Sequence, residues 1–330
     1  MHEIEIITNI WLQGIGEWLS VPMQLFSFLG TQYFQIILMA FIYWCVNNQV
    51  GIRLGIAIMI GSGFNTAFKW LFRSPRPYWI STDVKALSLE NSFGIPSGHA
   101  MVSTIAYGRI ALWVRKRWCN TLIALLLFLI GISRIYLGVH FLSDVIAGWC
   151  LGISFLVILF HIEKPLGKWI SKKNIWAKTI LFFLSSVIII LFFTVWKASI
   201  VNWQIPESWK ANIQAIGLTP ASIDPFRIKE IYTLSGLWFG SLTGYAWLNK
   251  CGGFQSKGTQ TQYLFRLLIG FAGLGMIFFL FSQVIDGFTN ELMNLGAIFI
   301  QYSLISIWIT AVAPLIFVKI GLAKRRNNKE

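Results

Sequence analysis

The chain has 330 residues, of which 56% are hydrophobic and 12% are charged, with a formal net charge of +14 and a mean hydropathy of +0.65. Soluble domains carry roughly 25% charged residues, so this composition excludes a water-soluble globular protein. The basic residues gather in short connections between apolar runs, which is typical of membrane proteins and argues against a nucleic-acid partner.

Apolar runs of about twenty residues recur along the chain, the length that an α-helix needs to cross a bilayer. They predict an all-α, polytopic membrane helix bundle with about nine transmembrane helices. The predicted spans are 21–46, 50–72, 98–114, 119–139, 141–162, 175–197, 229–248, 263–284 and 291–320.

Lysine and arginine fall in every second connection and at the C-terminal end. The first residues instead carry Glu3, Glu5 and Glu17. The positive-inside rule therefore predicts an N-terminus outside and a C-terminus in the cytoplasm. The residues before the first span lack the basic and apolar regions of a signal peptide, and we expect an interfacial segment there.

Four cysteines lie in or beside the predicted spans: Cys45, Cys119, Cys150 and Cys251. Their spacing matches no metal site and suggests no disulfide pairing. We expect buried free thiols.

Three polar motifs interrupt the apolar pattern. The first is KWLFRSPRP, with Lys69 and Arg76; the second is PSGHAM, Pro96 to Met101; the third is SRIYLGVHFLSDVIAG, residues 133–148. In the predicted topology the connection 73–97 and the turn near residue 140 share the non-cytoplasmic face. Charged groups there can meet water and still face the bundle.

These motifs together supply groups that suit a tetrahedral phosphate. Lys69, Arg76 and Arg134 offer three cations, and an arginine fork can bind two phosphate oxygens at once. Ser97 and Gly98 begin a predicted helix, where unpaired main-chain N–H groups and the helix dipole favour an anion.

The motifs also offer a nucleophile and an acid. His140 and Asp144 are four residues apart and share one face of a helix, so Asp144 can orient the imidazole. His99, on another predicted helix, is placed to protonate a leaving group. The part of the predicted non-cytoplasmic face where the three motifs lie has no carboxylate cluster suited to Mg²⁺. We therefore expect no metal and no cofactor. We interpret His2 and His161 as packing residues, and Arg73, Asp83 and Lys85 as solvated loop charges.

The three segments match K-x6-R-P, P-S-G-H and S-R-x5-H-x3-D, and over roughly residues 50–160 the chain resembles the type 2 phosphatidic acid phosphatase and vanadium haloperoxidase superfamily. The resemblance implies a metal-independent phosphatase in which His140 forms a phosphohistidine, with Asp144 as its partner. It implies that His99 is the acid for the leaving group. It also implies a set of phosphoryl-binding residues: Lys69, Arg76, Ser97, Gly98 and Arg134.

Lipid phosphatases of this superfamily resemble a six-span unit, which predicts a core at 1–197 followed by an outer loop and three additional helices at 198–330. The loop at 198–228 could be a lid, a substrate-selecting wall or a surface connection. Gly236, Gly240 and Gly244 recur every fourth residue and predict close packing, with another helix of this chain as the favoured partner and a second copy of the chain as the alternative.

The nine-span plan also resembles glucose-6-phosphatase, but that group lacks the aspartate that Asp144 supplies here. We therefore expect a phosphorylated lipid substrate, such as phosphatidic acid or a polyprenyl pyrophosphate, reached from the bilayer. The alternatives are a sugar-phosphate phosphatase and, in another class, a lipid or anion transporter; known haloperoxidases are soluble, unlike this chain. We expect a bacterial inner membrane with the site facing the periplasm or outside, or the endoplasmic reticulum lumen in a eukaryote. The sequence predicts no oligomeric state.

Overall fold

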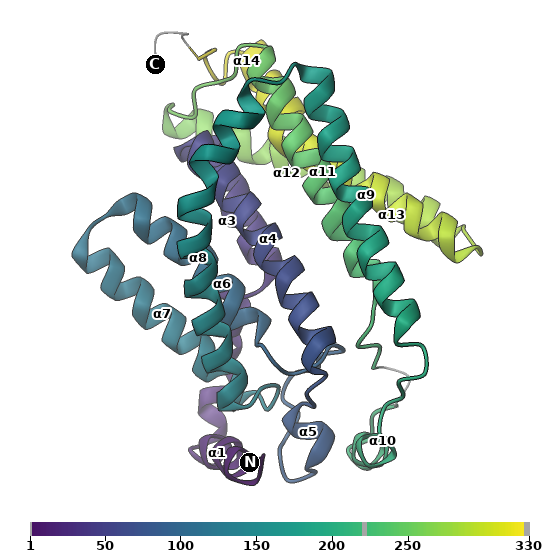
Figure 1. The fold of residues 1–330 in the computed structure, drawn as a ribbon. Helices are drawn as coiled ribbons and strands as arrows, with labels where there is room; N and C mark the ends of the chain where they lie inside the picture. Colours follow the sequence, from purple (N-terminus) through teal and green to yellow (C-terminus); the bar gives the residue numbers. More distant parts are fainter. Residues whose placement is uncertain (1, 220–222, 327–330) are drawn as a thin grey trace. The chain divides into compact units, whose positions relative to one another are not determined.

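A computed structural model describes residues 2–219 and 223–326, and all their regular secondary structure is helical (Figure 1). The longer helices in chain order are α1 (His2–Gly14), α2 (Ser20–Leu29), α3 (Gln32–Phe41), α4 (Asn48–Phe72), α6 (Gly98–Val114), α7 (Arg117–Tyr136), α8 (Leu142–Ser171), α9 (Ile175–Ser199), α10 (Glu207–Ala215), α11 (Ile228–Lys250), α12 (Gln260–Asp286) and α13 (Glu291–Ile307). Shorter ones are η1 (Glu17–Leu19), η2 (Ile42–Val46), α5 (Pro77–Ile80), η4 (Trp308–Val312) and α14 (Ala313–Lys319). The predicted all-α class is confirmed.

Six helices in the described ranges are long and apolar enough to cross a membrane, and a seventh span results if a bent pair counts as one. The bent pair joins Glu17–Leu29 to Gln32–Val46 at 55°. A helix lies at each of the nine predicted places, but α6 has only 17 residues and α11 is not among the six. The polytopic membrane bundle is confirmed, whereas the number of nine spans stays a prediction.

The burial of these helices fits a protein surrounded by lipid. In an apolar stretch of 18 residues within each of α8, α9 and α12, only 17% of the residues are buried. Broad apolar surface of this kind is unfavourable in water and suits contact with acyl chains. By contrast, 61% of the residues are buried in the corresponding stretch of Asn48–Ile80, the range that contains α4 and α5.

The four cysteines are free, as predicted, but the expectation that all are buried is wrong. Cys45 is buried, whereas Cys150 and Cys251 are exposed and Cys119 is intermediate. Cys150 lies on α8, whose apolar surface is mostly uncovered, so an apolar position there does not imply a position inside the protein.

The chain forms two compact units that are interleaved along the sequence. The first unit comprises Met1–Gln35, Ile60–Phe160 and Ile200–Arg227; the second comprises Ile36–Met59, His161–Ser199 and Ile228–Glu330. All three motifs lie in the first unit. The predicted division at residues 197 and 198 is consecutive rather than interleaved, and it stays a prediction.

Local signals place the ends of the helices near the motifs. Pro77 is the first residue of α5, where its fixed φ suits a helix start. Ser97 caps α6 through its side chain. The connection 73–97 and the turn 137–141 lie at the same end of the first unit, since Ser97 N–H donates to the Asp144 carbonyl at 2.9 Å. The side of the membrane that this end faces stays a prediction.

The segment 198–228 packs onto that same end, apart from residues 220–222, which lie outside the described residues. Trp209 contacts Trp79 with ring centroids 5.6 Å apart, and Trp203 contacts Phe93 at 5.3 Å. Asn212 donates to the Trp79 carbonyl at 3.2 Å. These contacts favour the interpretation of this segment as a wall beside the motifs over that of a surface connection.

In the second unit, the glycines of α11 allow close approach to α13 and η4. A Cβ on Gly240 would lie 2.2 Å from the Ser303 carbonyl oxygen, and one on Gly244 would lie 2.2 Å from Thr310 Oγ1. A Cβ on Gly236 would lie 2.5 Å from the Phe299 carbonyl oxygen. The predicted packing of this ridge against the chain's own helices is confirmed.

Replacing Gly240 with alanine should therefore destabilise the protein. The added methyl would push α11 away from the main chain of α13, and overpacking of this kind costs about 1–3 kcal/mol. We expect a lower melting temperature in detergent for Gly240→Ala. Gly296→Ala on α13 is the matched control, because nothing lies within 4 Å of its added Cβ. Equal melting temperatures for the two variants would contradict this packing.

Candidate functional site

Arg76 lies at the centre of the candidate site. Its side chain is fully buried, and its guanidinium donates to main-chain carbonyls from two separate segments. Nε donates to the Ser92 oxygen at 2.6 Å, and Nη1 donates to the Val139 oxygen at 2.7 Å. Nη1 also lies 3.3 Å from His140 Nε2. The first and third motifs, distant in sequence, therefore meet at one guanidinium.

His140 and Asp144 are in contact, with Nδ1 3.1 Å from Oδ2. Because a guanidinium can only donate, the contact with Arg76 requires His140 Nε2 to accept. This network assigns the ring proton to Nδ1, which then donates to Asp144. The main-chain N–H of Phe141 donates to the same carboxylate oxygen at 3.0 Å and holds it in place. The unprotonated Nε2 therefore faces Arg76.

Burial lowers the pKa of His140, and the positive charges of Arg76 and Lys69 lower it further. The imidazole is therefore neutral at pH 7 and remains neutral as the pH falls below about 6.5, the usual pKa of a histidine. A neutral imidazole keeps the lone pair that a nucleophile requires.

Lys69 reaches this centre from the last turn of α4. Its Nζ donates to Ser92 Oγ at 2.8 Å and to the Phe93 carbonyl oxygen at 2.7 Å. Nη2 of Arg76 donates to the same two oxygens, at 3.1 Å each. The two cations of the first motif are therefore held side by side by neutral acceptors.

Arg134 is held by side chains instead. Its Nη1 donates to Ser27 Oγ and its Nη2 donates to Glu90 Oε1. The second carboxylate oxygen of Glu90 lies 4.0 Å from Nη2 of Arg76. Burial raises the pKa of Glu90, but the charges of Arg134 and Arg76 outweigh burial and lower this pKa to about 2. Glu90 is therefore an anion at neutral pH.

The second motif begins α6 beside these groups. Ser97 Oγ accepts from Ala100 N–H at 3.4 Å, and its own N–H is bonded to the Asp144 carbonyl. A Cβ on Gly98 would lie 3.0 Å from Asn65 Oδ1, so a larger residue would be crowded. His99 lies in the first turn of α6, and its ring lies beside Gly30, whose added Cβ would be 3.1 Å from His99 Cδ2. Within the described residues, His99 makes no hydrogen bond to His140 or Asp144.

The sequence analysis missed the residues that reach the motif side chains from other segments: Asn9, Ser27, Glu90 and Ser92. Asn9 Nδ2 donates to the Ile135 carbonyl at 2.7 Å and to the His140 carbonyl at 3.1 Å. A signal was present for Asn9, because this polar residue lies between the apolar pairs Ile6–Ile7 and Ile10–Trp11 of α1. Nothing local distinguishes Glu90 from the other acidic loop residues.

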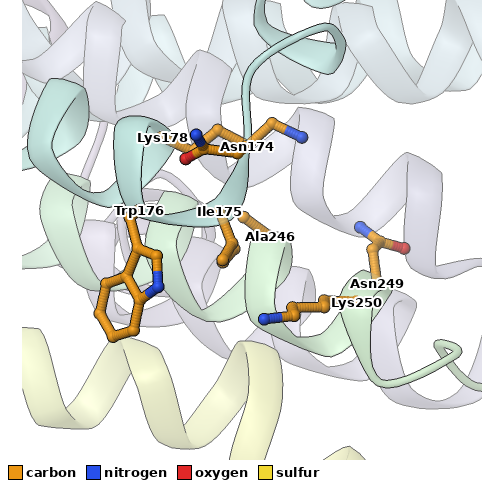
Figure 2. Close-up of a pocket in the computed structure, with 7 residues that line it drawn as sticks. All are labelled: Asn174, Ile175, Trp176, Lys178, Ala246, Asn249 and Lys250. Carbon is orange, nitrogen blue, oxygen red and sulfur yellow. The ribbon is translucent and has the colours of Figure 1, made fainter.

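A pocket of about 650 Å³ lies in the second unit, at the ends of α9 and α11 (Figure 2). Its lining residues are Asn174, Ile175, Trp176, Lys178, Ala246, Asn249 and Lys250. This lining contains lysines and amides but no histidine and no carboxylate, so it offers no nucleophile paired with an orienting base. The chemistry-bearing residues gather in the first unit instead.

Two family models match the chain. One is described as the PAP2 superfamily and matches residues 50–168, a range that contains all three motifs. The other is described as the transmembrane extension of PAP2 superfamily phosphatases and matches residues 232–325.

Curated relatives match shorter parts of the chain. Phosphatidylglycerophosphatase B of Bacillus subtilis is 35% identical over 94 residues, which is 26% of this chain and 44% of that protein. Undecaprenyl-diphosphatase of Sulfolobus acidocaldarius is 31% identical over 125 residues, 37% of this chain and 60% of that protein. Glucose-6-phosphatase catalytic subunit 1 of Canis lupus familiaris is 31% identical over 151 residues, 37% of this chain and 42% of that protein. The chain thus spans less than two thirds of each of these relatives.

The two matching models account for residues on both sides of the segment 198–228. The chain therefore contains a PAP2 superfamily domain at residues 50–168, followed at residues 232–325 by the transmembrane extension of PAP2 superfamily phosphatases.

Proposed function

We propose that the chain is an integral-membrane phosphatase that hydrolyses a phosphomonoester or pyrophosphate of a lipid on the non-cytoplasmic face. The observation that carries the proposal is the orientation of His140. Nδ1 is paired with Asp144, and Nε2 points at the guanidinium of Arg76. A nucleophile next to a cation that can hold phosphate oxygens is what in-line phosphoryl transfer requires.

In the proposed first step, His140 Nε2 attacks phosphorus and the bond to the leaving oxygen breaks. His99 donates a proton to that oxygen, while Asp144 stabilises the charge that develops on the His140 ring. In the second step, water attacks the phosphohistidine and His99 takes a proton from the water. Inorganic phosphate leaves and His140 is restored.

The proposed reaction uses protein cations where other phosphatases use metal ions. Lys69, Arg76 and Arg134 would balance the charge of the phosphoryl oxygens, with the first amides of α6 as further donors. In the described residues, no group of three or more His, Cys, Asp or Glu side chains forms a candidate metal site. In this proposal the cations and amides, rather than a metal ion, stabilise the phosphoryl oxygens.

The relatives' names support a lipid substrate and leave a second candidate. Phosphatidylglycerophosphatase B and undecaprenyl-diphosphatase are both named for phosphorylated lipids. Glucose-6-phosphatase catalytic subunit 1, which matches a similar share of this chain, favours a sugar phosphate as the second candidate. The apolar surface of α8, which begins beside the site, would let a lipid approach from the bilayer.

Purified full-length protein should release phosphate from at least one lipid in a panel of phosphatidic acid, phosphatidylglycerol phosphate and a polyprenyl pyrophosphate. EDTA should not reduce the rate. His140→Ala should lower kcat by at least about a thousandfold, because it removes the nucleophile. The readout is inorganic phosphate, measured in detergent micelles.

The matched control for that variant is His161→Ala, which removes an exposed histidine outside the motifs and should keep the activity. Hydrolysis of glucose 6-phosphate and of no lipid in the panel would contradict the lipid substrate. It would not contradict the proposed phosphoryl transfer to His140. Full inhibition by EDTA would contradict metal independence. Transport of a phosphorylated lipid by His140→Ala, with no hydrolysis by the native chain, would favour the transporter alternative.

Asp144→Asn should lower kcat by about 10²–10⁴-fold and change KM little. An asparagine can present its NH₂ group to Nδ1, which would favour the tautomer whose Nε2 carries a proton and cannot attack. Asp83→Asn, an exposed carboxyl in the connection 73–97, is the control and should leave both constants unchanged. A rise in KM with native kcat would show instead that Asp144 acts in binding.

The predicted orientation can be tested on intact cells. A cysteine introduced at Asp83, in a variant that lacks the four native cysteines, should react with a membrane-impermeant thiol reagent from outside. A cysteine introduced at Lys116, in the basic connection between α6 and α7, should react only after permeabilisation. The reverse pattern would place the candidate site on the cytoplasmic face.

A further inference from the structure

The cations of the candidate site are already bonded to oxygens from one short stretch of the connection 73–97. Ser92 and Phe93 provide neutral acceptors for Lys69 and Arg76. Glu90 differs from them because it brings a full negative charge to Arg134. A carboxylate at this position resembles an oxygen edge of a phosphate in both charge and spacing.

Arg134 is only partly satisfied by these contacts. Its Nε is buried, and no described residue accepts a hydrogen bond from it. Nε and Nη2 share one edge of the guanidinium, the edge that can hold an oxyanion through two parallel hydrogen bonds. Glu90 uses the Nη2 half of this edge. A buried charged donor without an acceptor is unfavourable, so the geometry favours an oxyanion that engages both positions.

Glu90 can leave Arg134 without a movement of the main chain. Tyr78 Oη donates to the Glu90 carbonyl at 2.9 Å and accepts from the Glu90 N–H at 3.2 Å. These bonds fix the backbone on both sides of the residue. The Glu90 side chain is 28% exposed, whereas that of Arg134 is 2% exposed. Rotation about the side-chain bonds can therefore carry the carboxylate toward water.

We propose that Glu90 is a positioning residue that competes with the phosphoryl group for Arg134. In the empty site the Glu90 carboxylate would bind the Arg134 guanidinium. It would move away from Arg134 when the substrate phosphate binds, and bind Arg134 again as inorganic phosphate leaves. This inference rests on the function proposed above. Without a competing anion, the three cations would hold inorganic phosphate tightly. Because product release limits turnover in many enzymes, a carboxylate that displaces phosphate would speed the reaction.

The exchange does not depend on protonation of Glu90. With its pKa lowered to about 2, the carboxyl group is ionised throughout the neutral range. The phosphate must therefore displace an anion, and the charge of Glu90 sets the affinity of the site for phosphate.

Glu90→Gln tests the inference, because it keeps the shape of the side chain and removes its charge. Binding of inorganic phosphate to the purified full chain is measured by isothermal titration calorimetry at fixed ionic strength. We expect the variant to bind phosphate at least about tenfold more tightly, since a like charge next to the dianion is gone. In steady-state assays, inorganic phosphate should inhibit the variant at correspondingly lower concentrations. Asp83→Asn, which removes an exposed charge from the same connection, should bind phosphate as the native chain does.

Unchanged or weaker phosphate binding by Glu90→Gln would overturn the inference and indicate that Glu90 only holds Arg134 in place. If that variant does not fold, Glu90→Asp decides, because its shorter side chain withdraws the carboxylate from Arg134. Phosphate binding by Glu90→Asp that is no tighter than native would then overturn the inference.

The titration needs no turnover, so it separates this inference from the proposed function. A chain that hydrolyses nothing in the panel but gains phosphate affinity in Glu90→Gln would contradict only the phosphatase. An active enzyme without that gain would contradict only the role of Glu90. Absence of phosphate binding in both the native chain and Glu90→Gln would overturn the role of Glu90.

Discussion

The buried guanidinium of Arg76 is the constraint on which the rest of the site depends. A charge removed from water is costly unless its N–H groups find acceptors, and an arginine cannot lose its proton to avoid this cost. The acceptors come from Ser92, Phe93, Val139 and His140, which lie in two distant connections. Satisfying one side chain therefore draws the loop before α6 and the turn before α8 together, and this places His140 beside a cation.

Helix ends then make the arrangement rigid. Asp144 lies in the first turn of α8 and is bonded through its side chain to Phe141 N–H and through its carbonyl to Ser97 N–H. Ser97 in turn caps α6. His140, its partner carboxylate and the start of α6 are thus linked by hydrogen bonds, which limits their freedom before any substrate binds.

One wall beside this site comes from the segment 200–227, which lies between the two matched regions of the superfamily. Trp203 and Trp209 pack against Phe93 and Trp79, and the Phe93 carbonyl accepts from both Lys69 and Arg76. Residues 200–227 accordingly belong to the same compact unit as the motifs. The aromatic contacts buttress the chain that holds the cations, so this segment acts on the geometry of the site through packing.

Local sequence pattern determined the membrane class, the helices, the pairing of His140 with Asp144 and the close packing of the α11 glycines. The helices and the glycine ridge depend on apolar length and on spacing along one helix, and both can be counted in the sequence. The four-residue separation correctly paired His140 with Asp144, but the expectation that one helix carries both is wrong, because His140 lies in the turn before α8, which begins at Leu142. Only the tertiary structure showed that Asn9 and Ser27 form hydrogen bonds with residues of the third motif. It alone showed that the Glu90 carboxylate accepts a hydrogen bond from Arg134. It also showed that α6, at one of the nine predicted spans, has only 17 residues. Partners from distant segments depend on how the chain folds back on itself, because a buried charge accepts any oxygen that packing brings within reach.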